Sequence, residues 1–140
     1  MFLLDINVLI ALVDPNHVHH SVVAKWFMEK RFDGWATCPI TENGFIRILG
    51  HINYPDGPKS TEATRELLAA LCSQPGHQFW PDSISLRDSN QFSALPISKN
   101  ITDYYLLACA VAGKAQLATM DKRIDPSVMK GGEAALHLIA

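Results

Sequence analysis

A chain of 140 residues is the usual size of one domain, and we expect residues 1–140 to form a single domain with a sizeable core. Hydrophobic residues make up 48% of the chain and charged residues 19%, which excludes a disordered protein, and no apolar run is long enough for a membrane helix. The net charge of −2 excludes a strongly basic nucleic-acid binder, but not an enzyme that holds nucleic acid through metal ions.

The chain begins with a buried strand that leads into a helix. Residues 1–5 are predicted to form the strand, because three apolar side chains are followed directly by Asp5. A short helix or turn is expected over residues 7–13, and helical spacing predicts a longer helix over residues 17–31. Residues 35–38 form a short apolar run before a proline, which indicates the second strand.

Two helices and a weaker strand follow. Thr41 is predicted to be the N-cap of a helix that carries the next apolar residues. After a loop rich in glycine and proline, Ser60 or Thr61 caps a strongly patterned helix over residues 62–73. Residues 77–80 are a weakly supported third strand.

The last third of the chain repeats the strand and helix alternation. A short helix is expected around residues 88–92, and the clearest helix of the chain runs over residues 101–112. Strands are predicted at residues 116–119 and 135–139, with Gly131 and its neighbour marking a loop between them. Strands that alternate with helices predict an α/β fold in which helices cover both faces of a parallel sheet.

Three cysteines and the N-terminal pattern indicate the compartment. Cys38, Cys72 and Cys109 are widely spaced, which is typical of reduced thiols in a cytosolic protein. The first apolar run has no basic residues before it and is interrupted by Asp5, so we expect no signal peptide. A cytoplasmic location without a membrane partner is therefore expected.

Four carboxylates fall at equivalent places in this pattern. Asp5 and Asp121 each end a predicted strand, whereas Glu42 and Asp103 each open a predicted helix. The carboxyl ends of parallel strands and the N-termini of the helices that follow them lie at the same edge of the sheet, where α/β proteins bind ligands. We therefore expect the four acids, far apart in sequence, to face one crevice.

Each of these acids alone also has a purely structural explanation. Acidic residues stabilise helix N-termini, which suffices for Glu42 and Asp103, and Asp121 fits an ordinary turn. Asp5 is harder to explain, because an acid at the end of a buried strand costs several kcal/mol of desolvation unless it is paired or bound to metal.

Taken together, the four acids favour a metal site. Crowded carboxylates repel one another, and no lysine or arginine lies beside Asp5 or Asp103 in the sequence to neutralise them. A divalent cation would do so, and an all-oxygen set of ligands suits Mg²⁺, with Mn²⁺ as a substitute. Such an ion activates water for attack on phosphorus.

Four sequence segments resemble the PIN-domain ribonucleases, and most closely the VapC-type toxins of bacterial toxin–antitoxin pairs. In order along the chain, the matching segments are residues 4–10, 39–47, 102–108 and 117–121. Each segment is short, but the four in this order and spacing are fairly specific. Residues 77–100 carry no motif that matches the family.

The resemblance implies a three-layer α/β/α sandwich with a central parallel sheet of four to five strands. It implies a metal-dependent endoribonuclease in which Asp5, Glu42, Asp103 and Asp121 surround Mg²⁺ or Mn²⁺. Two further polar residues match positions that support those acids in the family; they are Asn7 and Thr119. The resemblance also implies a homodimer, an RNA substrate and a VapB-type antitoxin that holds the toxin inactive.

Three basic residues are candidates for contact with RNA phosphate or with an antitoxin carboxylate. Arg47 follows Glu42 by five residues, and Lys122 and Arg123 come directly after Asp121. A solvated surface position explains all three about equally well.

The histidines at positions 17, 19 and 20 look at first like a metal cluster. His17, His19 and His20 lie at a predicted helix start without cysteines or acids at ligand spacing, and histidine suits Zn²⁺ better than Mg²⁺. A surface or packing role explains them better, and contact with RNA or with a partner protein is the alternative.

Two other classes of protein share part of this pattern. A phosphatase of the haloacid dehalogenase type needs a second aspartate two residues after the first, where this chain has Asn7. A PIN-like scaffold that binds RNA or protein without cleaving it remains the alternative, although the loss of an acid that would favour it is not observed.

Overall fold

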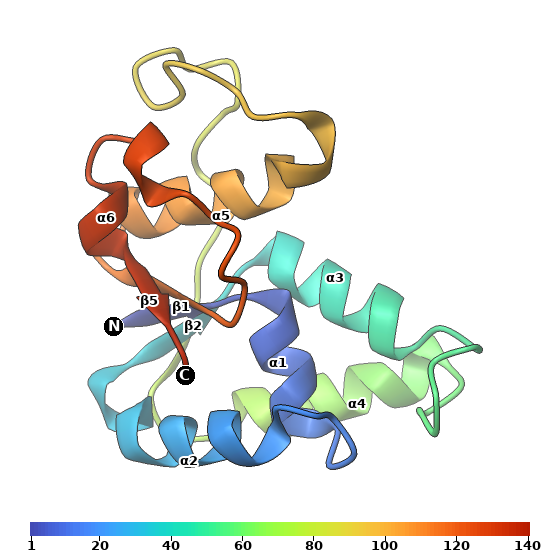
Figure 1. The fold of residues 1–140 in the computed structure, drawn as a ribbon. Coiled ribbons are helices and arrows are strands. Elements are labelled where there is room, and N and C mark those ends of the chain that lie inside the picture. The colour runs from blue at the N-terminus through green and yellow to red at the C-terminus, as the bar shows by residue number, and fades with distance from the viewer.

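The computed structural model describes residues 1–140 and has a five-stranded sheet at its centre (Figure 1). The strand order is β3-β2-β1-β4-β5, and every neighbouring pair is parallel. The strands are β1 (Phe2–Leu4), β2 (Trp35–Thr37), β3 (His77–Phe79), β4 (Gln116–Thr119) and β5 (Leu136–Leu138). The predicted parallel sheet, including its weakly supported third strand, is confirmed.

Helices cover both faces of this sheet. They are α1 (Ile6–Val13), α2 (His20–Lys30), α3 (Pro39–Leu49), α4 (Thr61–Cys72), α5 (Ile101–Ala112) and α6 (Gly132–Ala135). In Figure 1, α5 and α6 lie above the strands, whereas α2 and α4 lie below them. Helix α3 leaves the edge of the sheet and packs on α1 and α4. The three-layer α/β/α arrangement is therefore confirmed, and none of the helices is long and apolar enough to cross a membrane.

The alternation of side chains along β1 divides the core into two parts. Leu4 packs into the cluster under α1 and α2, whereas Leu3 packs into the cluster under α5. Both side chains are fully buried. A strand that is apolar on both faces is typical of a parallel sheet covered by helices, and burying each leucine contributes on the order of 2 kcal/mol.

Helix α3 begins three residues earlier than the sequence pattern predicted. Its N-cap is Cys38 and Pro39 is its first residue, so the prediction of Thr41 as N-cap was wrong. The Thr41 hydroxyl instead accepts a hydrogen bond from the backbone N–H of Cys38 at 2.9 Å, which closes a capping box. Proline is well suited to the first helical position, because that residue needs no N–H partner.

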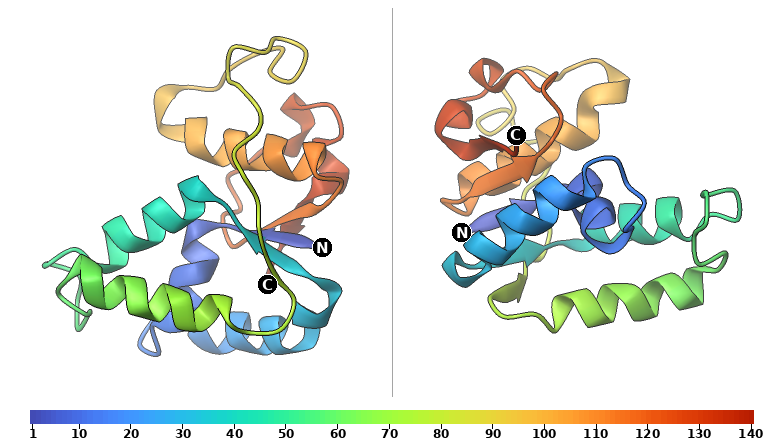
Figure 2. Two further views of the ribbon diagram at one scale, coloured as in Figure 1. Left: turned by 180° about the vertical axis from the view of Figure 1, so that it is seen from behind. Right: turned by 60° about the horizontal axis from the view of Figure 1, so that its bottom comes forward.

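The segment after β3 contains no helix around residues 88–92, so that prediction was wrong. The Asp88 side chain accepts a hydrogen bond from the Asn90 N–H at 2.9 Å, and such a local bond competes with helix formation. Phe92 is buried and stacks on Tyr105 of α5. Figure 2 shows this segment crossing from β3 to the outer side of α5.

The start of α2 and the presence of α6 also differ from the predictions. Helix α2 starts at His20 rather than at residue 17, because His17 and His19 lie in a turn where the His17 ring accepts the His19 N–H at 3.1 Å. A four-residue helix, α6, follows Gly131, where only a loop was expected. Gly131 adopts a φ of 80°, a conformation that favours glycine, and so permits the chain to enter that helix.

Changing Tyr54 to phenylalanine is expected to lower the free energy of unfolding by about 1 kcal/mol at neutral pH. The Tyr54 hydroxyl donates a 2.6 Å hydrogen bond to Asp14, at the end of α1, and this bond holds the pKa of Asp14 below its ordinary value of 3.8. A lowered pKa stabilises the fold at pH values above 3.8, and this contribution disappears as the pH falls through the lowered value. Urea unfolding of both proteins at several pH values checks this, and an equal difference at all pH values would contradict it.

Candidate active site

Asp5 lies where β1 ends and α1 begins, and its carboxylate is held on both oxygens. The side chain is buried, with 5% of the residue exposed. Its Oδ1 accepts the Ile6 N–H at 2.7 Å, and its Oδ2 accepts the hydroxyl of Thr119, from β4, also at 2.7 Å. Burial raises the pKa of Asp5, and these two hydrogen bonds oppose that rise. The chain therefore positions a carboxylate that is costly to keep charged.

Thr119 connects three polar groups at this edge of the sheet. Besides donating to Asp5, its hydroxyl accepts the Asp121 N–H at 3.1 Å and the side-chain amide of Asn7 at 3.5 Å. The other end of that amide, Asn7 Oδ1, is buried and has no hydrogen-bond partner. A buried carbonyl oxygen without a partner costs free energy, and a cation or an ordered water next to it would remove that cost.

Asp103 enters the same site from the first turn of α5. Burial raises the pKa of Asp103 to about 6, and repulsion from Asp5 and Asp121 adds to that rise. The three aspartates that the sequence predicted to meet are thus close enough to act on one another. Beside them lies a cavity of about 130 Å³ lined by Lys99, Asn100, Asp103, Tyr104, Asp121, Arg123 and Ile124.

Asp121 has a basic partner of its own. The Arg123 guanidinium donates two hydrogen bonds to its carboxylate, at 3.0 and 3.1 Å, and these hold the pKa of Asp121 below its usual range. The Arg123 side chain is 89% exposed, so the pair contributes little to stability. The Arg123 side chain is therefore held only weakly at Asp121.

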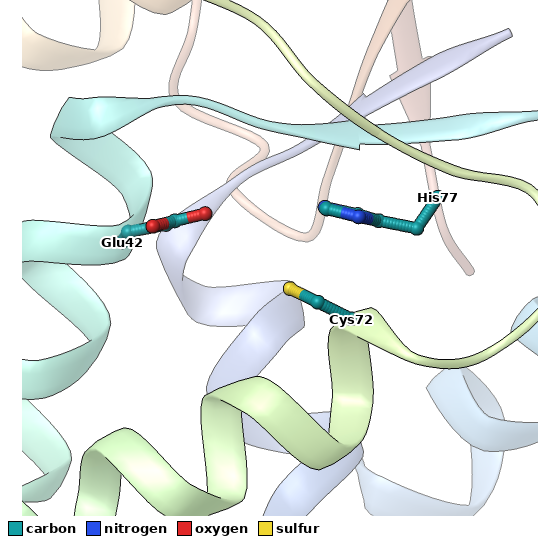
Figure 3. A group of neighbouring side chains, drawn as sticks. All are labelled: Glu42, Cys72 and His77. Atoms are coloured by element: carbon teal, nitrogen blue, oxygen red, sulfur yellow. The ribbon is translucent and has the colours of Figure 1, made fainter.

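Glu42, the fourth predicted acid, contacts a different set of residues. Its Oε2 accepts the hydroxyl of Thr37, at the end of β2, at 2.7 Å. Figure 3 shows Glu42 pointing from α3 toward Cys72 and His77. Besides burial, the charge of Glu42 raises the pKa of the Cys72 thiol, and it opposes the lowering of the His77 pKa that burial causes. The structure thus brings together three of the four predicted acids and directs the fourth toward its own group of neighbours.

The remaining predicted residues are on the surface. Arg47 is exposed on α3, and Lys122 is exposed beside Asp121. The prediction missed Lys99, which lines the cavity beside Asp103 and Asp121. It lies in residues 77–100, where no motif was found, and its only sequence signal is its position four residues before Asp103.

The donor set fits a hard divalent cation. Asp5, Asp103 and Asp121 offer carboxylate oxygens, and the unpartnered Oδ1 of Asn7 lies at the same edge. Oxygen ligands of this kind suit Mg²⁺ or Mn²⁺. Burial is the main cause of the raised pKa of Asp103, and a cation would offset the repulsion from Asp5 and Asp121 that adds to it. The histidines are elsewhere: His20 contacts the Ala11 carbonyl at 2.7 Å, and His17 and His19 lie together beyond α1.

Comparison with known proteins identifies the family. The model of the PIN domain family matches residues 2–126. Ribonuclease VapC44 of Mycobacterium tuberculosis is 40% identical over 131 residues, which are 92% of each chain. Ribonuclease VapC39 of the same organism is 38% identical over 131 residues, which are 92% of this chain and 94% of VapC39. Ribonuclease VapC38 is 36% identical over 124 residues, which are 86% of this chain and 85% of VapC38. The chain therefore belongs to the PIN domain family, with proteins named as VapC ribonucleases among its relatives.

Proposed function

We propose that this protein is a metal-dependent endoribonuclease and the toxin of a toxin–antitoxin pair. The observation that carries the proposal is the meeting of Asp5, Asp103 and Asp121 at the carboxyl edge of the sheet, with the pKa of Asp103 raised to about 6. The relatives, which cover most of the chain, are named ribonucleases. Carboxylates that repel one another in the absence of metal are suited to holding Mg²⁺ or Mn²⁺.

Different residues would bind the metal ion, orient its ligands and attract the RNA. Asp5, Asp103, Asp121 and, after a side-chain rotation, Glu42 would hold the ion, which lowers the pKa of a bound water and neutralises phosphate charge. Thr119 orients Asp5 through its hydroxyl. Lys99, which lines the cavity, is positioned to attract the RNA backbone to it.

Three other residues complete this proposal. Arg123 lines the cavity as well, and Lys122 is its exposed neighbour, so both are suited to holding RNA phosphate next to the acids. Arg47 is exposed on α3 and would contact either RNA or the antitoxin.

Two protein partners also belong to this proposal, a VapB-type antitoxin and a second copy of the chain in a homodimer. Both rest on the family resemblance. Light scattering on the purified chain tests the dimer.

Cleavage of total RNA by the purified protein tests the proposed activity. We expect cutting with Mg²⁺ or Mn²⁺ and none after a chelator removes the ion, because the three aspartates then repel phosphate as well as one another. Gel analysis of the RNA measures both, and restoring the metal must restore cutting. The Asp5→Asn variant, purified in parallel, shows whether any remaining cleavage comes from a contaminating nuclease.

The cleavage assay also distinguishes a ribonuclease from a PIN-like scaffold that binds RNA or protein without cleaving RNA. If folded protein that is free of antitoxin cuts no RNA with either metal, the catalytic proposal fails and the binding scaffold becomes the better explanation. RNA retention by the uncleaving protein on a filter would then be the next measurement.

A further inference from the structure

Glu42, Cys72 and His77 form a group of potential metal ligands outside the three-aspartate site (Figure 3). They come from α3, from the last residue of α4 and from the first residue of β3. A carboxylate oxygen, the Cys72 sulfur and a His77 ring nitrogen all lie within 4.8 Å of one another, and all three residues are half-buried. The group is therefore reachable by an ion from solvent.

The backbone holds two of these ligands at a fixed separation. Cys72 and His77 are joined by a tight turn in which Gly76 adopts a φ of 88°. Strand pairing places His77 opposite Trp35, and their rings pack at 4.7 Å between centroids. Ordered positions of this kind reduce the entropy that is lost when side chains bind an ion.

The Thr37 hydroxyl lies between Glu42 and His77. Thr37 Oγ1, which is fully buried, donates to Glu42 Oε2 at 2.7 Å and lies 2.8 Å from His77 Nε2. Because the hydroxyl has one proton and gives it to the carboxylate, His77 must donate to it in this arrangement. Both ligand atoms are thus directed at the Thr37 hydroxyl oxygen. A cation would bind beside this oxygen by replacing the two hydrogen bonds, with the proton of His77 Nε2 moving to solvent or, through the other tautomer, to Nδ1.

The chemistry of this group differs from that of the three aspartates. Nitrogen, sulfur and a single carboxylate are the ligands that Zn²⁺ takes, with bonds of about 2.0–2.3 Å and ligand atoms roughly 3.5 Å apart in a tetrahedron. The three ligand atoms now lie within 4.8 Å of one another, so they would have to approach one another by at most about 1 Å to reach this geometry. We propose that Glu42, Cys72 and His77 bind Zn²⁺, with water in the fourth position.

Zn²⁺ bound to Glu42, Cys72 and His77 would compete with the three-aspartate site for Glu42. The proposed nuclease needs Glu42 to turn toward Asp5 and Asp103, whereas zinc would keep it beside Cys72 and His77. Zn²⁺ would then inhibit cleavage without occupying the three-aspartate site. This consequence rests on the proposed function, but the zinc site itself does not.

Titration with Co²⁺, a spectroscopic substitute for Zn²⁺, tests the site directly in the whole, reduced protein. We expect a thiolate-to-cobalt charge-transfer band, which ions held by oxygen ligands alone do not give, and its loss when Zn²⁺ is added. Cys72→Ser should abolish the band and His77→Gln should weaken cobalt binding about tenfold or more. Cys109→Ser is the matched control, because Cys109 is also half-buried but lies outside the group, and it should retain the band.

Two results would overturn the zinc site. One is the absence of the band in folded wild-type protein, and the other is its persistence in Cys72→Ser. Circular dichroism of each variant shows that a lost band does not come from unfolding. This titration needs no RNA, so it decides the zinc site even if the protein proves not to be a nuclease.

Cleavage assays test the competition for Glu42. With Mg²⁺ present, added Zn²⁺ should reduce cutting by wild-type protein and by Cys109→Ser at least severalfold more than it reduces cutting by Cys72→Ser. Equal inhibition of all three would show that zinc acts elsewhere and would overturn the proposed competition.

Discussion

Changing Asp103 to asparagine is expected to reduce RNA cleavage about 100-fold or more and, at the same time, to stabilise the metal-free protein. The loss of activity follows from removing a carboxylate that would hold the ion, since metal stabilisation of phosphate charge is worth several kcal/mol. Cleavage rates at saturating Mg²⁺ measure it. Asparagine has nearly the same shape, so the fold should be preserved.

The stabilisation follows from the raised pKa of Asp103. Burial and the neighbouring aspartates raise this pKa from 3.8 to about 6, so the ionised form is less favourable in the folded than in the unfolded chain. The penalty appears as the pH rises above 3.8 and is complete above pH 6. After allowance for solvent screening of this half-buried group, we expect the variant to gain about 1 kcal/mol at neutral pH and nothing in acid.

A matched control and added metal make this prediction specific. Asp33→Asn removes an exposed carboxylate that has no part in the site, and it should change neither cleavage nor stability. Mg²⁺ should stabilise the wild-type protein more than Asp103→Asn. An Asp103→Asn protein that cuts RNA at the wild-type rate would show that the acidic site is not catalytic.

Changing Thr119 to valine is expected to destabilise the protein by about 2 kcal/mol and to reduce cleavage about 10- to 100-fold. Valine has the shape of threonine but lacks the hydroxyl that donates to Asp5 and accepts the Asp121 N–H. Asp5 would lose one of the two hydrogen bonds that offset its burial, so its pKa should rise further. Urea unfolding and cleavage rates measure the two effects.

Thr64→Val separates the loss of stability from the loss of function. Thr64 is buried in α4, and its hydroxyl donates to the Ser60 carbonyl at 2.7 Å, far along the chain from the acids. Its replacement should cost about 1 kcal/mol of stability and leave cleavage unchanged. If Thr119→Val and Thr64→Val have equal activity, Thr119 only packs the core.

The elements that the sequence predicted most accurately are those buried on both faces. The apolar run at residues 116–119 was expected as a strand and is β4 with the same bounds. Residues 101–112 were expected as a helix and are α5, because apolar residues cover most of its circumference. In these segments local pattern and tertiary packing favour the same structure.

Local side-chain bonds decided the places where the sequence pattern failed. The helix expected around residues 88–92 is absent where the Asp88 side chain bonds a nearby backbone N–H. Thr41 was expected to cap α3, yet its hydroxyl reaches back to Cys38 from the third position of that helix. Both residue types favour caps and turns, so their sequence signal does not distinguish the two positions.

The sequence by itself determined which edge of the sheet carries the acids, because the carboxyl ends of parallel strands lie together in any such fold. Asp5, Asp103 and Asp121 therefore meet as expected. Only the tertiary structure decided where Glu42 points. Its side chain has several rotatable bonds, and its partners Thr37, Cys72 and His77 are brought to it by β2, the end of α4 and β3, a neighbourhood that no local pattern around Glu42 encodes.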